Sequence, residues 1–444
     1  MKCICQRLLT NSMAPVRKST HVDKWRRKML PDMTEILIIG AGPTGMALSI
    51  ALHQANVDHV LIEKLAHGLQ TSRAGVIHAQ TLESLEPLGV TQRLSELSVK
   101  LEDFAIRDRN RALLKLDFCK LPSRHPYLMM LPQNLTEQVF AERISALGGT
   151  IHREVEAVAV AQDSVGARVT VVQNGQEKII SARYVVGADG MQSLVRKSTG
   201  IEFDGAAYDG SFVLADVRLD WPAGPTEVSL FFAPAGLVVV APLPDGSYRV
   251  VATMDEAPEK PDVADIQALL DSRGPTRNKA RVLGIGWSSR FRLHHRLVRA
   301  YRKDRLFLMG DAAHVHSPAG GQGMNTGIID AVVLGQLLGD VVNGVRSEAE
   351  LDLYETLRRP AAQEVLDLAG RMTDMALARN PVKRFLRNLA LSVVDLSPFL
   401  KRRIALKLSG LSRAPLARLP APSAMPGAVE ASKSETGPKL KLAA

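Results

Sequence analysis

Residues 310–327, with the sequence GDAAHVHSPAGGQGMNTG, have a composition that points directly to chemistry. The segment holds five glycines, one proline and two histidines, and it has almost no bulky side chains. It lies between an apolar run at 306–309, which predicts a strand, and a helix-like run from Ile328 onward. Because glycine lets a ligand approach the main chain closely, the segment predicts a backbone surface against which a ligand lies.

A second glycine-rich segment, GAGPTG at 40–45, fits the G-x-G-x-x-G pattern between a predicted strand and a predicted helix. In this pattern the first glycine permits the turn, the second lets the backbone approach a pyrophosphate, and the third lets the helix pack on the strand. A carboxylate at the end of the following predicted strand, HVLIEK, is placed to accept a hydrogen bond from a ribose hydroxyl. The predicted dinucleotide-binding residues are Gly40, Gly42, Pro43, Thr44, Gly45, Glu63 and Lys64.

Two other interpretations share this pattern. One is a glycine turn that binds nothing, and the other is the nucleotide site of a nicotinamide-dependent dehydrogenase. No second strand-borne G-x-G-x-x-G exists, since GIGWSS at 284–289 lacks the third glycine. A permanently bound NAD(P) on its own Rossmann domain is therefore not expected.

The longer run RLFLMGDAAHVHSPAGGQGMNTGIIDA, residues 305–331, is similar to the second FAD motif of the class A flavoprotein monooxygenases, the aromatic hydroxylases related to p-hydroxybenzoate hydroxylase. The resemblance implies that Asp311 binds the ribitol chain of FAD and that Pro318, a candidate catalytic residue, lies beside the reactive edge of the flavin. It also implies that loop glycines run along the ring and that amides at the next helix start stabilise negative charge on reduced flavin. The residues of this loop and helix start are Gly320, Gly321, Gly323, Met324 and Asn325.

Two further segments resemble the same family. VVGADGMQSLVRK (185–197) implies that Asp189 and Arg196 serve FAD and the transient encounter with nicotinamide. SRAGVIHAQTLESLEPLG (72–89) places Arg73, the second candidate catalytic residue, against the cofactor, and Gln133 corresponds to a glutamine near the pyrophosphate. The alternatives are that Arg73 and Gln133 are solvated polar residues and that His314 is a structural histidine of its loop.

The expected fold class is α/β: a Rossmann-like FAD-binding domain with an inserted, mainly antiparallel β-sheet substrate domain and C-terminal helices. The strand, helix, strand order at 34–64 predicts a parallel sheet, and KIISARYVVGADG (178–190) predicts a strand pair ending in a tight turn. Short β-type runs split by Pro and Gly at 211–254 predict an antiparallel sheet. The expected boundaries are 33–98, 132–202 and 298–354 for the FAD-binding domain, 99–131 and 203–297 for the substrate domain, and 355–412 for the helices.

The two ends of the chain differ from its body in composition. Residues 1–32 carry eight Lys/Arg and two Asp, and we interpret them as a disordered basic extension, with a transit peptide as the alternative. Residues 413–444 are rich in Pro, Ala and Ser and are expected to be disordered. Because most of the net charge of +10 lies in the leader, the charge does not predict a nucleic-acid partner.

Composition also limits the other classes of protein. No apolar window of membrane-spanning length is free of charge, so no transmembrane segment is predicted. Three cysteines and scattered histidines predict neither a disulfide framework nor a metal site. We expect a cytoplasmic enzyme, and the sequence does not indicate its oligomeric state.

The resemblance implies a monooxygenase that uses FAD, NADPH or NADH, and O2 to hydroxylate an aromatic or quinone-type substrate through a flavin C4a-hydroperoxide. The run EVSLFFAPAGLVVVAP (227–242) has one acid and no Arg, Lys, His or Tyr. If it lines the substrate pocket, it favours a large, apolar, phenol- or quinone-like substrate, possibly polycyclic. The alternative is that this run belongs to the hydrophobic core and does not contact the substrate. The basic run at 382–408 indicates either contact with an anionic membrane or, as we favour here, a solvated cationic face. The alternative functions are an FAD-binding sensor or assembly protein without turnover, and a flavin-dependent reductase.

Overall fold

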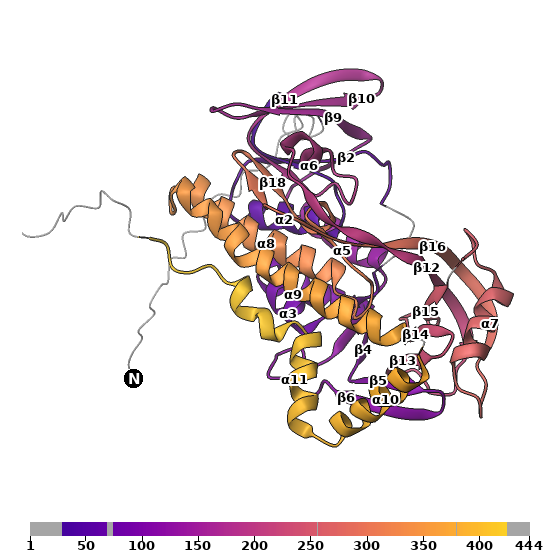
Figure 1. Cartoon of the computed structure of the whole chain (residues 1–444). Helices are drawn as coiled ribbons and strands as arrows, with labels where there is room; N and C mark the ends of the chain where they lie inside the picture. Colours follow the sequence, from indigo (N-terminus) through magenta and orange to yellow (C-terminus); the bar gives the residue numbers. More distant parts are fainter. Residues whose placement is uncertain (1–28, 69–73, 255, 379, 424–444) are drawn as a thin grey trace, which may run out of the picture.

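The computed structural model describes residues 29–68, 74–254, 256–378 and 380–423 (Figure 1). One eight-stranded sheet has the order β17-β18-β11-β1-β2-β8, and β10 and β9 extend it from β11 as an antiparallel hairpin. From β18 to β8 the neighbours are parallel. The strands are β1 (Met33–Ile39), β2 (His59–Glu63), β8 (Ile151–Arg153), β9 (Val155–Gln162), β10 (Ala167–Gln173), β11 (Gln176–Gly187), β17 (Arg302–Lys303) and β18 (Leu306–Leu308).

Helices with close-packed small residues cover this sheet. Helix α2 (Pro43–Gln54) packs on α8 (Gly323–Val342) and on α5 (Gln133–Ala146). A Cβ at Gly335 of α8 would lie 2.6 Å from the Cβ of Ala51, so the α2–α8 contact requires glycine there. The shorter elements around this layer are α3 (Ala79–Leu85), η1 (Glu86–Leu88), α4 (Thr91–Leu97), α6 (Leu194–Thr199), η2 (Gly310–Ala312) and η3 (Glu348–Asp352).

A second eight-stranded sheet has the order β19-β16-β12-β15-β14-β13-β5-β6 and is antiparallel except between β13 and β5. Its long strands β12 and β16 run from the middle of the molecule to the region covered by α7 (Figure 1). The elements are β5 (Asp103–Asp108), β6 (Arg111–Asp117), β12 (Phe203–Asp220), β13 (Glu227–Ala233), β14 (Gly236–Pro242), β15 (Tyr248–Met254), α7 (Val263–Arg273), β16 (Arg281–Val298) and β19 (His314–Val315). A small sheet of β3 (Val76–Ile77), β7 (Leu128–Met130) and β4 (Val99–Leu101) lies between the two.

The expected α/β class, with a parallel sheet and a mainly antiparallel second sheet, is confirmed. Three C-terminal helices follow: α9 (Leu353–Ala376), α10 (Pro381–Asp395) and α11 (Pro398–Leu408). Among the described residues, only α8 is long and apolar enough to cross a membrane, and 78% of that stretch is buried inside the protein, as expected for a core helix.

Two local predictions are wrong. The run at 178–190 is not a strand pair, because β11 continues through it as one strand of 12 residues. The boundary of the disordered tail is also wrong at its start, because residues Leu411–Ala417 form the 3-10 helix η4 and Arg413 is buried. Composition could not place this boundary, because Arg413 is ordered by a distant contact: it donates a buried hydrogen bond to Gln322, which lies 91 residues earlier in the chain.

Candidate functional site

A cavity of about 1130 Å³ lies between the two large sheets. It exceeds the roughly 300–1,000 Å³ of an ordinary small-molecule pocket, so it has room for a cofactor and a substrate. The predicted residues that line it are Gly40, Gly42, Pro43, Thr44, Glu63, Lys64, Gln133, Asp189, Asp311, Pro318, Gly320, Gly321, Gly323 and Met324. Gly45 and Asn325 lie behind the cavity wall, and Arg73 lies outside the described residues.

The three glycines of the first turn have different physical roles. Gly40 has a φ of +104°, and a Cβ there would lie 2.4 Å from the Ala188 carbonyl oxygen. A Cβ at Gly45 would lie 1.9 Å from the Gly40 carbonyl oxygen, so this glycine lets α2 pack on the turn. Apart from its own chain neighbours, no atom of the described residues lies within 4 Å of the Cβ position of Gly42, and this glycine faces the cavity. The open space at Gly42 is therefore available to a ligand, and the N-terminus of α2 favours an anionic one.

Glu63 fixes the end of β2 beside this turn. Its Oε2 accepts a hydrogen bond from the Ala41 amide at 2.8 Å, and its Oε1 accepts one from the Leu65 amide at 3.0 Å. Each carboxylate oxygen has a second lone pair, so both can still accept from ligand hydroxyls.

Asp189 offers a buried acceptor oxygen at the edge of the cavity. Its Oδ2 accepts hydrogen bonds from the amides of Leu194 and Val195 at 2.7 and 3.2 Å. Its Oδ1 is buried and has no hydrogen-bond partner in the described protein, and burial raises the pKa of this carboxyl group. A buried acceptor at the edge of a cavity is suited to a hydroxyl donor of the cofactor.

Arg196 is not among the residues that line the cavity, and its contacts are with the protein. Its guanidinium is buried and donates to the carbonyls of Ala312 and Met191 at 2.8 and 2.6 Å. It also lies over the Phe203 ring, 4.1 Å from the ring centroid. Arg196 therefore ties the loop after β11 to the loop after β18, and it acts on the site through their positions.

The glycines of 310–327 are required largely by protein neighbours. A Cβ at Gly321, where φ is +61°, would lie 2.1 Å from Cγ1 of Val76, and one at Gly327 would lie 2.5 Å from Oγ1 of Thr44. Gly310 has a φ of +56° and approaches the same Thr44 hydroxyl. The prediction that a ligand approaches this backbone thus explains only part of the composition, because the first glycine turn and β3 also lie against it.

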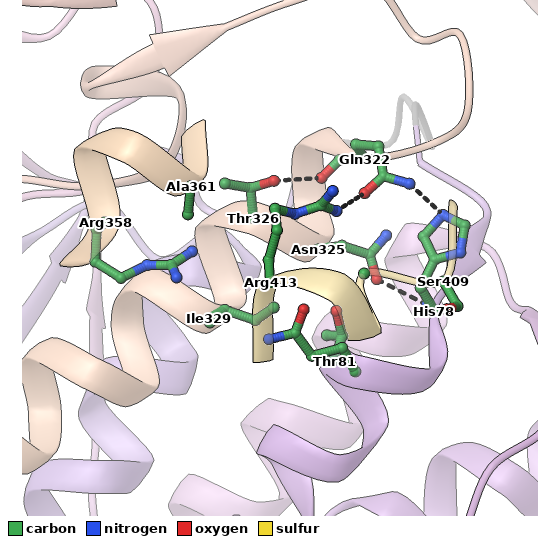
Figure 2. A pocket seen from close by; sticks show the side chains of 12 residues that line it. His78, Thr81, Gln322, Asn325, Thr326, Ile329, Arg358, Ala361, Ser409 and Arg413 are labelled. Carbon is green, nitrogen blue, oxygen red and sulfur yellow. Dashed lines mark hydrogen bonds between the residues drawn. The ribbon is translucent and has the colours of Figure 1, made fainter. Parts of the chain in front are cut away.

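A polar network behind the loop holds it in place, and the sequence analysis did not identify it (Figure 2). His78 Nε2 lies 2.8 Å from the Gly320 carbonyl oxygen. Asn325 accepts from the His78 amide at 2.9 Å and donates to the Gly321 carbonyl at 2.8 Å. Arg413 reaches in from the C-terminal segment and donates to Oε1 of Gln322 at 2.9 Å. Asn325, expected to act by its backbone, therefore also positions the loop by its side chain.

Asp330 organises the other side of the loop. It is fully buried on α8, and its carboxylate lies 2.7 Å from Nε2 of His314 and 2.8 Å from Nε of Arg358. The Gly310 amide donates to the same carboxylate at 3.2 Å. His314 also stacks on Tyr301. The interpretation of His314 as a structural histidine is confirmed by these contacts.

The walls of the cavity on the second sheet are apolar on alternate residues. Along β13, β14 and β15, one set of side chains packs with α7 and the other set faces the cavity, as the two-residue period of a strand requires. The cavity-facing apolar residues of the second sheet include Phe104, Phe212, Leu214, Val228, Leu230, Phe232, Leu237, Val239, Ala241 and Val251. The run at 227–242 is therefore core on one face and cavity wall on the other.

The cation that the second sheet contributes to the cavity lining, Arg249, is not available as a free charge. The Arg249 guanidinium donates to both carboxylate oxygens of Asp216, at 2.8 and 2.7 Å, and to the Ala74 carbonyl at 2.6 Å. Because Asp216 neutralises it, Arg249 does not create a strong preference for an acidic substrate.

Two histidines in the wall, the buried His78 and the half-buried His316, are neutral at physiological pH. Burial lowers the pKa of His78 to about 4 and that of His316 to about 4, against only partial compensation by the carbonyls they contact. An unfolded histidine has a pKa of about 6.5. Between these values the unfolded chain binds more protons than the folded protein, so the stability falls as the pH drops from about 6.5 towards 4.

We therefore expect His78→Gln to reduce the loss of stability on acidification. Each such histidine is expected to contribute about 2 kcal/mol of destabilisation between pH 7 and pH 5. Urea unfolding of wild type and variant at both pH values measures the difference. His67→Gln, at an exposed position, serves as the control and is expected to behave like wild type. Equal pH dependence in wild type and His78→Gln would contradict the assignment.

A dinucleotide cradle on a parallel sheet that opens into an apolar cavity is typical of oxidoreductases with a dinucleotide cofactor. The family model described as "FAD binding domain" matches residues 33–369. The chain belongs to this family, the class A FAD-dependent aromatic monooxygenases, and the expected resemblance is confirmed. No group of three or more His, Cys, Asp or Glu residues that could hold a metal occurs in the part of the chain that the structure describes.

Individual relatives support the same assignment. The chain is 34% identical over 353 residues to pentachlorophenol 4-monooxygenase from Sphingobium chlorophenolicum, covering 77% of this chain and 65% of that protein. It is 33% identical over 379 residues to 6-methylpretetramide 4-monooxygenase from Streptomyces rimosus, covering 84% and 68%. The solved structure of an anhydrotetracycline hydroxylase from Streptomyces rimosus matches with a TM-score of 0.71 at 32% identity, covering 85% and 76%. The chain therefore spans about two thirds of the length of the first two relatives.

Proposed function

We propose that the protein is an FAD-dependent monooxygenase that uses NADPH or NADH and O2 to hydroxylate a large, apolar aromatic or quinone-type substrate. The observation that carries the proposal is one continuous cavity with two different walls. One wall is a dinucleotide cradle with an open glycine and a buried free acceptor, and the other is a sheet of apolar side chains. The names of the relatives include a chlorinated phenol and tetracycline-type polycycles, which agrees with this class of substrate.

The residues of the first wall fit FAD. Gly42 and the α2 N-terminus would hold the pyrophosphate, Glu63 the ribose, and Asp189 and Asp311 hydroxyl groups of the cofactor. The loop from Pro318 to Met324 would lie along the flavin ring. When bound and reduced by NADPH or NADH, FAD supplies the activation of O2 for transfer of one oxygen atom to an aromatic ring.

The protein contributes orientation and exclusion of water. His78, Asn325 and Arg413 hold the loop carbonyls and Gln322 from behind, which leaves the loop surface free for the cofactor. The apolar side chains of the second sheet bind the substrate by burying its apolar surface, and they exclude water from the space between substrate and cofactor. Since Arg249 is neutralised by Asp216, an electron-rich neutral ring is favoured over a benzoate.

The test is to purify the protein, record its absorption spectrum with FAD and measure NADPH and NADH oxidation with phenols, quinones and polycyclic aromatics. We expect an oxidised-flavin spectrum, oxidation accelerated by apolar aromatics, and a product that gains one oxygen atom by mass spectrometry. A flavoprotein whose NAD(P)H oxidation is accelerated without oxygen gain would indicate a reductase. A flavoprotein that none of these compounds stimulates would favour a sensor or assembly role.

A variant of the cavity wall makes this test specific. Val251→Phe narrows the cavity from β15, so it is expected to raise the KM of polycyclic compounds more than that of simple phenols, with an unchanged flavin spectrum. Leu283→Phe, at an exposed position of the same sheet, is the matched control. If both variants keep the wild-type KM values, the substrate does not bind against β15.

A further inference from the structure

Helix α10 exposes an apolar stripe to solvent. Its large apolar residues recur at spacings of three and four, so they share one face of the helix. The exposed residues of this stripe are Val382, Phe385, Leu386, Leu389 and Val393, and Leu396 extends it into the turn before α11. Phe385 is 67% exposed and Leu396 is 82% exposed. A helix that only covers a protein core would turn this face inward.

The face of α10 that is turned towards the protein combines apolar packing, by Leu391 and Val394, with several polar contacts. Arg387 is buried, donates to the Met375 carbonyl at 2.8 Å and lies over the Phe232 ring, 4.8 Å from its centroid. Asn388 donates to Asp108 at 2.7 Å, and Asp395 accepts from the Lys115 amide at 2.9 Å. Helix α10 is therefore apolar on two faces, and these inward contacts leave the stripe that contains Phe385 and Leu389 turned outward.

The stripe continues onto α11, and the same two helices carry the exposed cations Lys383, Arg402, Arg403 and Lys407. Phe399 is 66% exposed, and Leu400 is also exposed. Residues 381–408 contain seven Lys/Arg and one acid, Asp395, which is paired with Lys401 at 3.0 Å. Arg402 and Arg403 are exposed. Two copies of this surface would repel each other, whereas an apolar stripe with a cationic border matches an anionic lipid surface.

We infer that α10 and α11 dock the protein onto an anionic lipid bilayer, with the apolar stripe inserted at the boundary between headgroups and acyl chains. The two helices lie at one edge of the molecule, away from the β9–β11 hairpin (Figure 1). Met372 of α9 and Leu408 of α11 line the large cavity, so the docking surface adjoins the apolar wall that would bind substrate. This placement suits an apolar substrate that partitions into the membrane. Lipid binding does not depend on the proposed reaction, and the two can fail separately.

The experiment uses the full chain with FAD and sedimentation with vesicles. One set of vesicles contains phosphatidylglycerol and phosphatidylcholine in equal amounts, and the other contains phosphatidylcholine alone. We expect binding to the anionic vesicles that weakens with added salt, and much weaker binding to the neutral ones. Arg402→Gln with Arg403→Gln is expected to weaken binding about thirty-fold. Phe385→Ser with Leu389→Ser and Phe399→Ser is expected to weaken it at least about a hundred-fold.

The control replaces two exposed apolar residues at the other end of the molecule. Val165 and Ile179 are 84% and 57% exposed and lie in the antiparallel strands β9 to β11 or the turn between them. The double variant Val165→Ser with Ile179→Ser is expected to bind vesicles like wild type. Absence of binding to anionic vesicles, or equal binding by the triple serine variant, would overturn the inference. So would a wild-type dimer in analytical ultracentrifugation that the triple variant abolishes without any vesicle binding, because the stripe would then cover a second copy.

Discussion

Gly42→Ala is expected to weaken FAD binding by about ten- to a hundred-fold while leaving the stability of the cofactor-free protein within about 0.5 kcal/mol of wild type. Gly42 has φ −73° and ψ −179°, an extended conformation that alanine adopts, and in the described part of the chain nothing but its sequence neighbours lies within 4 Å of its Cβ position. The added methyl group therefore meets only what the cavity holds. Quenching of FAD fluorescence on titration with protein measures the affinity, and thermal denaturation measures the stability.

Gly45→Ala is the matched control for that experiment. Its Cβ would lie 1.9 Å from the Gly40 carbonyl oxygen, which is backbone and cannot move away without displacing the turn. We expect this variant to lose both stability and FAD binding. If Gly42→Ala instead binds FAD with wild-type affinity, the cofactor does not approach the turn there, and the proposed position of the pyrophosphate is wrong.

The sequence predicts best what depends on neighbouring residues. The strand, glycine turn and helix at 33–54 follow from local pattern, and Gly45 is needed within the turn itself, against the Gly40 carbonyl oxygen. The sequence does not show that Gly40 is also needed against Ala188, which follows the distant strand β11. The alternation along β13 to β15 is also local, although the sequence alone does not distinguish a core face from a cavity face. The orientation of α10 was not predicted, since its helical period does not say which face meets the protein.

The contacts that complete the site are not local, and this explains why the sequence analysis missed them. His78 meets Gly320 across 242 residues, and Arg413 meets Gln322 across 91. From the sequence alone, such polar residues cannot be distinguished from solvent-exposed ones, because their burial depends on segments far away in the chain. Arg196 is a related case, because its motif predicts a role towards the cofactor but does not show that its side chain connects two loops.

Asp330→Ala is expected to lower the free energy of unfolding by about 3–5 kcal/mol, because it leaves the buried Arg358 guanidinium without its carboxylate. Burial acts to raise the pKa of Asp330, but His314 and Arg358 outweigh it and the pKa is lowered. The carboxylate therefore contributes stability that is present above the unfolded pKa of about 4 and is lost as the pH falls through its folded pKa. Urea unfolding at pH 7 measures the loss.

A double-mutant cycle separates the unpaired charge from general damage to the core. Arg358→Met alone leaves Asp330 with His314 and the Gly310 amide, and Asp330→Ala with Arg358→Met removes both charges. We expect the double variant to be more stable than Asp330→Ala, with a coupling energy of about 1–3 kcal/mol. Additive losses would show that the pair does not interact as the 2.8 Å contact indicates. Asp330 also accepts a hydrogen bond from the Gly310 amide, in the loop that faces the cavity. We therefore expect Asp330→Ala, alone or combined with Arg358→Met, to bind FAD more weakly than Arg358→Met alone. This difference would link the buried pair to that loop.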